Sequence, residues 1–248
     1  MTVGRSQNPI GSFGICPSMD EHSQKDLSRG KALCAGPRRP FTEEEIKIMR
    51  DFFDDPIRSQ NHKAWRDRAL FYILCLTGFR GHEVACMRWD YCFNFEKGSF
   101  RECIFIPRRY TKGARATRRV WSSSQLKYEL AQWKMRWPMV YGRLPTREDL
   151  VVSSIKRDKA KRPLAPETLW RIIRKDIFDK ACKDPRFDPT FIGVHSCRKF
   201  AISKRFKITK DAFDAAKFAG HAHPQTTMRY ISGPNPEEEN QIAKRMRI

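Results

Sequence analysis

The apolar positions that follow residue 45 repeat with the spacing of an amphipathic helix. Ile46, Met49 and Phe53 fall on one face of that helix. Thr42 should open it, because a glutamate stands three residues later in the pattern of a capping box. A second helical stretch runs from about residue 64 and should end at Gly78, since glycine readily adopts the left-handed conformation that closes a last helical turn.

The period changes after a further short helix that follows Arg80. Residues 102–107 and 117–121 alternate as β-strands do, with a turn at 108–116 between them. Helical spacing then returns in residues 123–137, 166–182, 194–206 and 209–219, and in a last helix that bears Tyr230. These elements predict a mostly α-helical fold with one small antiparallel β-sheet, of the α+β class.

The same pattern divides the chain into three regions. Residues 1–40 are rich in Gly, Ser and Pro and show no apolar period, which indicates a flexible basic tail. Residues 41–235 carry the periodic elements and should form the folded part. Residues 236–248 form a charged carboxy-terminal tail.

The net charge is the property that most narrows the class of binding partner. Lys and Arg number 49 against 28 Asp and Glu, a net charge of +21 with a pI near 10.0. Such an excess favours nucleic acid as the partner over an anionic membrane surface. The apolar runs, such as residues 70–76, are too short to span a bilayer, and no amino-terminal signal segment is evident. We therefore expect an intracellular, cytoplasmic protein that binds nucleic acid and no membrane.

Neither cysteine nor histidine spacing predicts a metal site. The eight cysteines include no C-x-x-C pair, and several lie in apolar runs, which is typical of small buried thiols. His221 and His223 have the spacing of a ligand pair, but no carboxylate or thiol stands near them at ligand spacing. We expect no metal and no other cofactor.

Candidate chemistry is concentrated near the carboxy terminus. His195 and Arg198 share one face of a predicted helix, and Gly220-His221 and Tyr230 follow. Arginine can stabilise negative charge on phosphate, histidine can move protons near pH 7, and a tyrosine can act as a nucleophile if it is activated. Singly, each has an ordinary explanation, as a solvated helix face, a helix end or a packed aromatic. Their order and spacing together are specific.

That order resembles the tyrosine recombinases, the phage-integrase family, over roughly residues 41–235. Thr77-Gly-Phe-Arg80-Gly-His-Glu83 is similar to the family's T-G-L-R-x-x-E box. His195-Ser-Cys-Arg198 is similar to its H-x-L-R box, and Ala219-Gly-His221 followed by Thr226-Thr-Met-Arg-Tyr230 to its L-G-H-x-x-x-x-T-T-x-x-Y box. Thr111-Lys112-Gly113 lies in the predicted hairpin turn, where the family carries a lysine.

The resemblance implies a catalytic domain at residues 41–235 and a role for each matched residue. Tyr230 would attack a DNA phosphate and form a 3′-phosphotyrosyl bond, without metal. Arg80 and Arg198 would hold the non-bridging oxygens, and His221 would hydrogen-bond the phosphate. Lys112 would protonate the leaving 5′-oxygen, and His195 would accept the tyrosine proton. Glu83 is interpreted as a residue that orients an active-site side chain.

The basic excess should line a groove around the duplex. The candidate DNA contacts are Arg108, Arg109, Arg115, Arg118 and Arg119 near the hairpin, and Lys204, Arg205 and Lys207 beyond the second box. By resemblance, four protomers would act together on DNA in integration, excision or inversion, and residues 236–248 could dock on a neighbouring protomer. The short amino-terminal tail cannot be the family's core-binding domain, so a partner protein could supply that part.

Two other functions remain open at this point. A type IB topoisomerase uses the same phosphotyrosine chemistry, although the T-G-x-R-x-x-E box and the Gly-His…Tyr box favour the recombinase. A recombinase-derived domain could also bind DNA as an accessory factor without cutting it. The complete set of Arg80, Lys112, His195, Arg198, His221 and Tyr230 favours an enzyme over such a factor.

Overall fold

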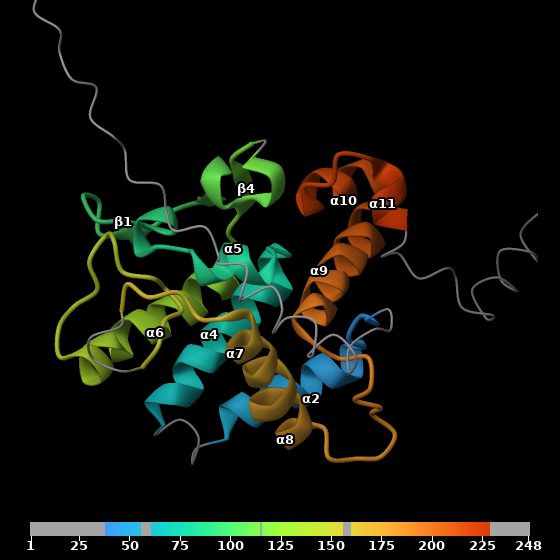
Figure 1. Cartoon of the computed structure of the whole chain (residues 1–248), viewed down its shortest axis with the longest axis horizontal. Helices are drawn as coiled ribbons and strands as arrows, with labels where there is room; N and C mark the ends of the chain where they lie inside the picture. Colours follow the sequence, from blue (N-terminus) through green and yellow to red (C-terminus); the bar gives the residue numbers. More distant parts are fainter. Residues whose placement is uncertain (1–37, 56–60, 115, 156–159, 229–248) are drawn as a thin grey trace, which may run out of the picture. The chain divides into compact units, whose positions relative to one another are not determined.

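The computed structural model describes residues 38–55, 61–114, 116–155 and 160–228. These residues belong to one unit, Arg38–Ile248. Of the tail expected at residues 1–40, only 38–40 are described, and Arg115 and the segment from 229 onward also lie outside the described residues. The unit is mostly helical and contains small antiparallel sheets (Figure 1). The α+β class expected from the sequence is confirmed.

The first helix, α2 (Glu43–Asp54), begins as its sequence predicts. The Thr42 hydroxyl accepts from the Glu45 backbone N–H at 3.1 Å, and the Glu45 carboxylate accepts from the Thr42 N–H at 2.8 Å. Met49 and Phe53 are buried, and so is Glu45, whose charge is paired with Arg39. The capping box therefore also holds the segment before the helix, because Arg39 binds the same carboxylate.

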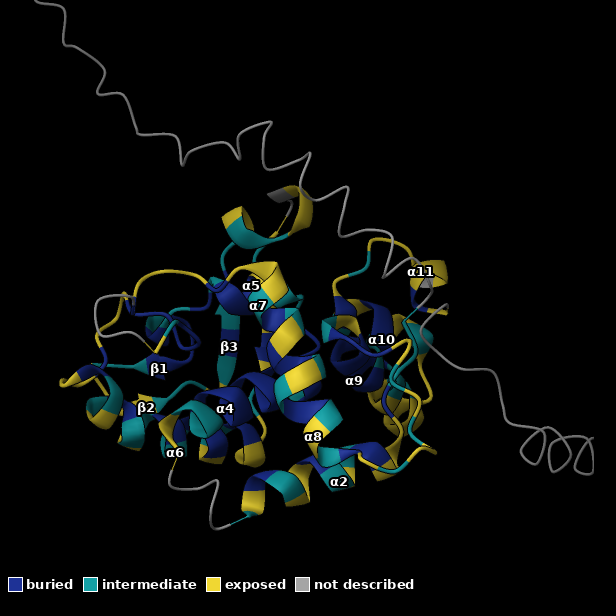
Figure 2. Ribbon diagram, turned by 60° about the horizontal axis from the view of Figure 1, so that its bottom comes forward, coloured by how far each residue is buried: buried dark blue, intermediate teal, exposed yellow. Residues whose placement is uncertain are grey.

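The central helix of the unit is α4 (His62–Thr77), which packs against both α6 (Ser124–Tyr141) and α9 (Val194–Thr209). It is buried along most of its length, so its apolar residues do not form a single stripe (Figure 2). Asn61 caps its start, and Gly78 ends it with a φ of 58° as predicted. Arg68 of α4 and Glu129 of α6 form a buried ion pair across that helix contact, with Nε and Oε2 2.6 Å apart.

The strands form two separate two-stranded sheets among the described residues. β3 (Cys103–Ile106) pairs antiparallel with β4 (Arg118–Trp121), close to the predicted strands, with Ile104 opposite Val120. The pair β1 (Phe93–Asn94) and β2 (Ser99–Phe100) was not predicted from the sequence. Strands of two residues are too short to show an alternating pattern, so only the larger hairpin could be foreseen. Short 3₁₀ turns, η2 (Trp89–Tyr91), η3 (Arg108–Tyr110) and η4 (Lys112–Ala114), complete this part.

The helix predicted at residues 166–182 is divided into three pieces. α7 (Pro166–Arg171) leads into a π-helical turn (Ile172–Phe178) and then α8 (Asp179–Ala181). Its apolar side is buried and its polar side exposed, so the predicted stripe is confirmed although the helix is not regular (Figure 2).

Three helices complete the described chain. After α9 come α10 (Ala212–Ala219), which packs on α9, and the short α11 (Pro224–Met228). Gly220 ends α10 with a φ of 65°. The position expected for the helical Tyr230 lies outside the described residues. No helix in the described part of the chain is long and apolar enough to cross a membrane.

Candidate active site

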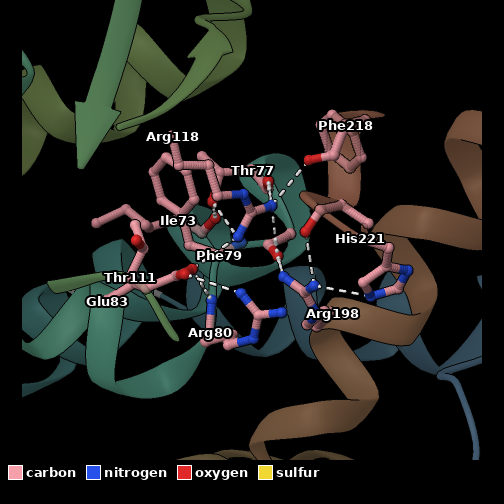
Figure 3. Close-up of polar contacts among 12 residues, drawn as sticks. Ile73, Thr77, Phe79, Arg80, Glu83, Thr111, Arg118, Arg198, Phe218 and His221 are labelled. Atoms are coloured by element: carbon pink, nitrogen blue, oxygen red, sulfur yellow. Dashed lines mark hydrogen bonds and ion pairs between the residues drawn. The ribbon is translucent and has the colours of Figure 1, made fainter. Parts of the chain in front are cut away.

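The site is built at the point where α4, α5 (Gly81–Ala85), β4, α9 and α10 come together (Figure 3). Its central residues are Arg80, Glu83, Arg118, Arg198 and His221, which we call the arginine network. Each comes from a different motif along the chain, except that Arg80 and Glu83 share one. Most of the network is therefore formed by tertiary contacts and not by local sequence.

Arg80 and Glu83 form a capping pair at the start of α5. The Glu83 carboxylate accepts from the backbone N–H of Arg80 at 2.6 Å and from its guanidinium at 3.0 Å. Glu83 is fully buried, whereas the Arg80 side chain is partly exposed. The Glu83 carboxylate therefore holds both the backbone and the guanidinium of Arg80.

Arg118 approaches the same carboxylate from strand β4. Its guanidinium donates to Glu83 at 2.7 Å, to the Gly78 carbonyl at 3.0 Å and to the Phe218 carbonyl at 2.8 Å. Only 7% of the residue is exposed. The sequence predicted a DNA contact for Arg118; in the structure the strand turns its side chain inward, where protein groups hold it.

Arg198 lies on α9 and is held by the ends of two other helices. It donates to the Gly78 carbonyl at the end of α4, to the Ala219 carbonyl at 2.7 Å, and to Nε2 of His221 at 3.0 Å. Only 1% of the residue is exposed. The second and third boxes of the sequence, which hold Arg198 and His221, are thus joined by a direct hydrogen bond.

The same hydrogen bond determines the state of His221. A guanidinium can only donate, so Nε2 must accept, and Nδ1 then carries the proton that it shares with the Thr227 hydroxyl at 2.8 Å. Burial, together with the positive charges of Arg198, Arg80 and Arg118, lowers the pKa of His221 to about 4. The ring is therefore neutral at pH 7.

Glu83 and Arg118, at the centre of the arginine network, shift each other's pKa. Burial raises the pKa of Glu83, but the charges of Arg118 and Arg80 and the Arg80 N–H act against it, and the net pKa is lowered. Burial lowers the pKa of Arg118 to about 10, with Glu83 opposing and Arg80 adding to the change. Both groups are therefore charged at pH 7.

His195 lies near this network at the start of α9. The helix begins at Gly193, whose N–H donates to the Ser196 hydroxyl at 3.1 Å. His195 is exposed, and desolvation followed by the charges of Arg198 and Arg80 lowers its pKa. A neutral, accessible imidazole beside arginines can accept a proton near pH 7.

Lys112 is exposed in the turn between β3 and β4, as predicted. Gly113 follows it with a φ of 74°, and the Thr111 hydroxyl before it donates to Arg108 and Ala116 carbonyls at 2.8 and 3.1 Å. Within the described part of the chain, no hydrogen bond links Lys112 to the arginine network. Tyr230 lies outside the described residues, so the structure does not place the expected nucleophile.

The other residues expected to contact DNA differ in their surroundings. Arg108, Arg109, Arg119 and Lys207 are exposed. Lys204 and Arg205 are also exposed, but they are paired with Glu43 at 3.3 Å and with Asp214 at 2.6 Å. Arg115 lies outside the described residues.

Thr227 was not predicted as the hydrogen-bond partner of His221. Thr227 is fully buried, and its position in a Thr-Thr pair six residues after the histidine was the available signal. The six described cysteines are free, and four of them are buried, as expected for structural thiols. No cluster of three metal-ligating side chains occurs among the described residues.

Comparisons with known proteins agree with this architecture. No protein-family model and no curated protein matches the sequence. Solved structures do match. The XerH site-specific recombinase, bound to a palindromic difH substrate after cleavage, superposes with a TM-score of 0.63 at 20% identity, over 85% of this chain and 54% of the XerH chain.

Two further matches have the same fold. The XerA recombinase gives a TM-score of 0.60 at 17% identity, over 86% of this chain and 66% of that one. The Tn1549 transposon integrase, in complex with transposon right end DNA, gives 0.59 at 12% identity, over 85% and 67%. The chain therefore has the fold of the tyrosine recombinase catalytic domains, and it spans about half the length of XerH.

Proposed function

We propose that this chain is a site-specific DNA recombinase of the tyrosine type, which cuts and rejoins double-stranded DNA through a covalent phosphotyrosine. The observation that carries the proposal is the convergence of Arg80, Arg198 and His221, with Glu83 behind them. These residues come from three separate boxes whose order resembles that family. The solved neighbours, which are recombinases and an integrase, support the same class.

In the proposed reaction, the Tyr230 phenolate oxygen attacks the scissile phosphorus and the bond to the 5′-oxygen breaks. His195 accepts the phenol proton, and Lys112 gives a proton to the leaving 5′-oxygen. Arg80 and Arg198 stabilise the negative charge that grows on the non-bridging oxygens. The phosphotyrosine keeps the energy of the broken bond, so attack by a 5′-hydroxyl of another strand rejoins the DNA without ATP.

The guanidinium of Arg198 must become accessible when DNA binds. Its guanidinium is almost fully buried in the described structure, and a phosphate cannot reach it in that state. We propose that DNA binding uncovers one edge of this guanidinium while the Gly78 and Ala219 carbonyls keep holding it. The held arginine would then meet the phosphate already oriented, at little entropic cost.

The exposed arginines near the hairpin would track the DNA backbone, and residues 41–235 would act as the catalytic domain. We propose that a partner protein contributes further contacts to the DNA. We also propose that four protomers act together in the rearrangement of a mobile element, with residues 236–248 docking on a neighbour. Deleting 236–248 should then abolish pairing of two DNA sites and leave single-site binding intact; full recombination by the deleted protein would disprove the docking.

Covalent trapping tests the chemistry directly. The protein is mixed with nicked duplexes of randomised sequence without added metal, denatured in SDS and examined for a DNA-linked band. The wild type should form the band and Y230F should not, and the linked peptide should contain Tyr230. Sequencing the trapped DNA would then give the target site.

Absence of a wild-type band, with salt-sensitive DNA binding intact, would instead indicate a non-cutting DNA-binding factor. A band that persists in Y230F would assign the nucleophile to another residue. Relaxation of any supercoiled plasmid without a preferred site would favour a topoisomerase.

A further inference from the structure

Neighbouring arginines on β4 face opposite ways. Arg118 and Val120 are buried, whereas Arg119 and Trp121 are exposed, as expected for alternating positions of a strand. A buried arginine needs hydrogen-bond partners for its charge, and Arg118 finds them on three separate elements. Arg119 provides a matched residue of the same type on the same strand.

Arg118 contacts both halves of the arginine network. Through Nη1 it binds Oε2 of Glu83, and that same oxygen accepts the Arg80 backbone N–H. Through Nη2 it binds the Gly78 carbonyl, which also accepts from Arg198. Arg118 therefore shares one acceptor atom with each of the two arginines that would hold the phosphate.

The third contact of Arg118 reaches the turn that carries His221. Its Nη2 donates to the Phe218 carbonyl at 2.8 Å, and the next carbonyl, that of Ala219, accepts from Arg198. Gly220 then passes directly over the Arg118 side chain. A Cβ at Gly220 would lie 3.2 Å from Arg118 Nε and 3.3 Å from its Cδ, so the glycine leaves the room that the arginine occupies.

We propose that Arg118 is a positioning residue for the cleavage reaction: it fixes Arg80 through Glu83, and Arg198 and His221 through the carbonyls of Gly78 and Phe218. This inference rests on the proposed function and goes beyond it, because it assigns a role to a residue that would touch neither DNA nor nucleophile. Lysine cannot replace it, since only a planar guanidinium presents donors in two fixed directions at once.

The test compares R118K, R118M and R119A with the wild type in three measurements. These are DNA affinity with its salt dependence, the rate of covalent adduct formation at saturating nicked duplex, and thermal stability. If Arg118 positions the site, R118M should cleave about 100-fold more slowly and R118K at least about 10-fold more slowly, while both bind DNA within about 2-fold of the wild type.

R119A should show the opposite behaviour. Loss of one phosphate contact should weaken binding and reduce the slope of log K against log salt by about 0.9, with the rate at saturation unchanged. If R118K and R118M instead lose affinity and salt slope as R119A does, Arg118 is a DNA contact. If they cleave at the wild-type rate, the positioning role is wrong.

A neutral substrate separates positioning from general damage. A methylphosphonate at the scissile position lacks one anionic oxygen and needs less help from the arginines that hold the phosphate. The defects of R118K and R118M should therefore shrink at least about 10-fold on this substrate if Arg118 acts through Arg80 and Arg198. An equal defect on both substrates would show a merely structural role.

E83Q provides a second route if R118M does not fold. Glutamine keeps an acceptor for the Arg80 N–H but weakens the hold of Arg118, so the E83Q/R118K protein should be no slower than the slower single variant. Multiplying defects would mean independent roles and would overturn the inference. The wild-type protein tests the proposed function separately. If it forms no covalent DNA adduct, the proposed function fails whatever the variants do.

Discussion

The protonation state of His221 can be tested by stability measurements that need no DNA. The pKa of this residue is lowered from the ordinary 6.5 to about 4, first by burial and then by the charges of Arg198, Arg80 and Arg118. A lowering of this size corresponds to ~3 kcal/mol between the two protonation states. The ring is partly exposed, so we expect solvent screening to reduce the measured value to about 2 kcal/mol.

The sign of the pH effect follows from proton uptake. Between pH 6.5 and about 4, the unfolded chain binds a proton on His221 and the folded chain does not. The stabilisation from the neutral, hydrogen-bonded ring is therefore complete above pH 6.5 and is lost as the pH falls towards 4. In the same range His221 can no longer accept the hydrogen bond from Arg198 once it is protonated.

H221Q isolates this contribution. A glutamine can accept from Arg198 through its carbonyl oxygen and donate to Thr227 through its amide, but it does not titrate. Urea unfolding of wild type and H221Q at several pH values between 4 and 7.5 gives the difference in unfolding free energy, in which the carboxylates common to both proteins cancel. That difference should change by about 2 kcal/mol across the range, in favour of the wild type at the higher pH.

A difference that is constant between pH 4 and 7.5 would refute the neutral, buried state of His221. A change of the opposite sign would mean that the folded protein holds the ring protonated, and the direction of the bond with Arg198 would then be wrong. The matched control is H223Q, which replaces an exposed histidine.

Two further predictions concern packing and buried charge. G220A should lower the free energy of unfolding in urea by about 2–3 kcal/mol, because the added Cβ strains a positive φ and crowds Arg118. The control G142A, at a φ of 71° with no atom within 4 Å of the added Cβ, should lose only about 1 kcal/mol. Equal losses in the two variants would contradict the packing argument. E129A should cost about 3–5 kcal/mol, because the buried Arg68 loses two hydrogen bonds of 2.6 and 2.9 Å; a loss below ~1 kcal/mol would show that the pair contributes little.

The sequence was most informative where structure is local. Capping at Thr42 and the helix end at Gly78 each depend on residues within a few positions of one another, and both are found as expected. Spacing rules apply directly at this range, because helix geometry alone decides which groups meet.

The hydrogen-bond partners of Arg118 could not be foreseen from the neighbouring sequence. Its partners lie 35, 40 and 100 positions away in the sequence, so no local pattern contains them. One signal was available: Arg118 stands two residues before Val120 on a strand and therefore shares its buried face. The predicted DNA contact did not take into account this alternation of buried and exposed positions, which distinguishes Arg118 from Arg119.

Two helix ends explain how the arginine network keeps its charge. α4 and α10 each end at a glycine with positive φ, and the carbonyls near those ends, at Gly78, Phe218 and Ala219, accept from Arg118 and Arg198. Carbonyls at helix carboxy ends carry partial negative charge, so they orient a guanidinium without neutralising it.

The balance of charge within the arginine network then favours a phosphate. Three guanidiniums stand against the single carboxylate of Glu83, and His221 is neutral, so the network holds two net positive charges. Ion pairing with further carboxylates would have cancelled that charge, and solvation in an open groove would have weakened it. In the proposed reaction, orientation by backbone carbonyls would leave that charge available to a transition state that is more negative than the phosphate from which it forms.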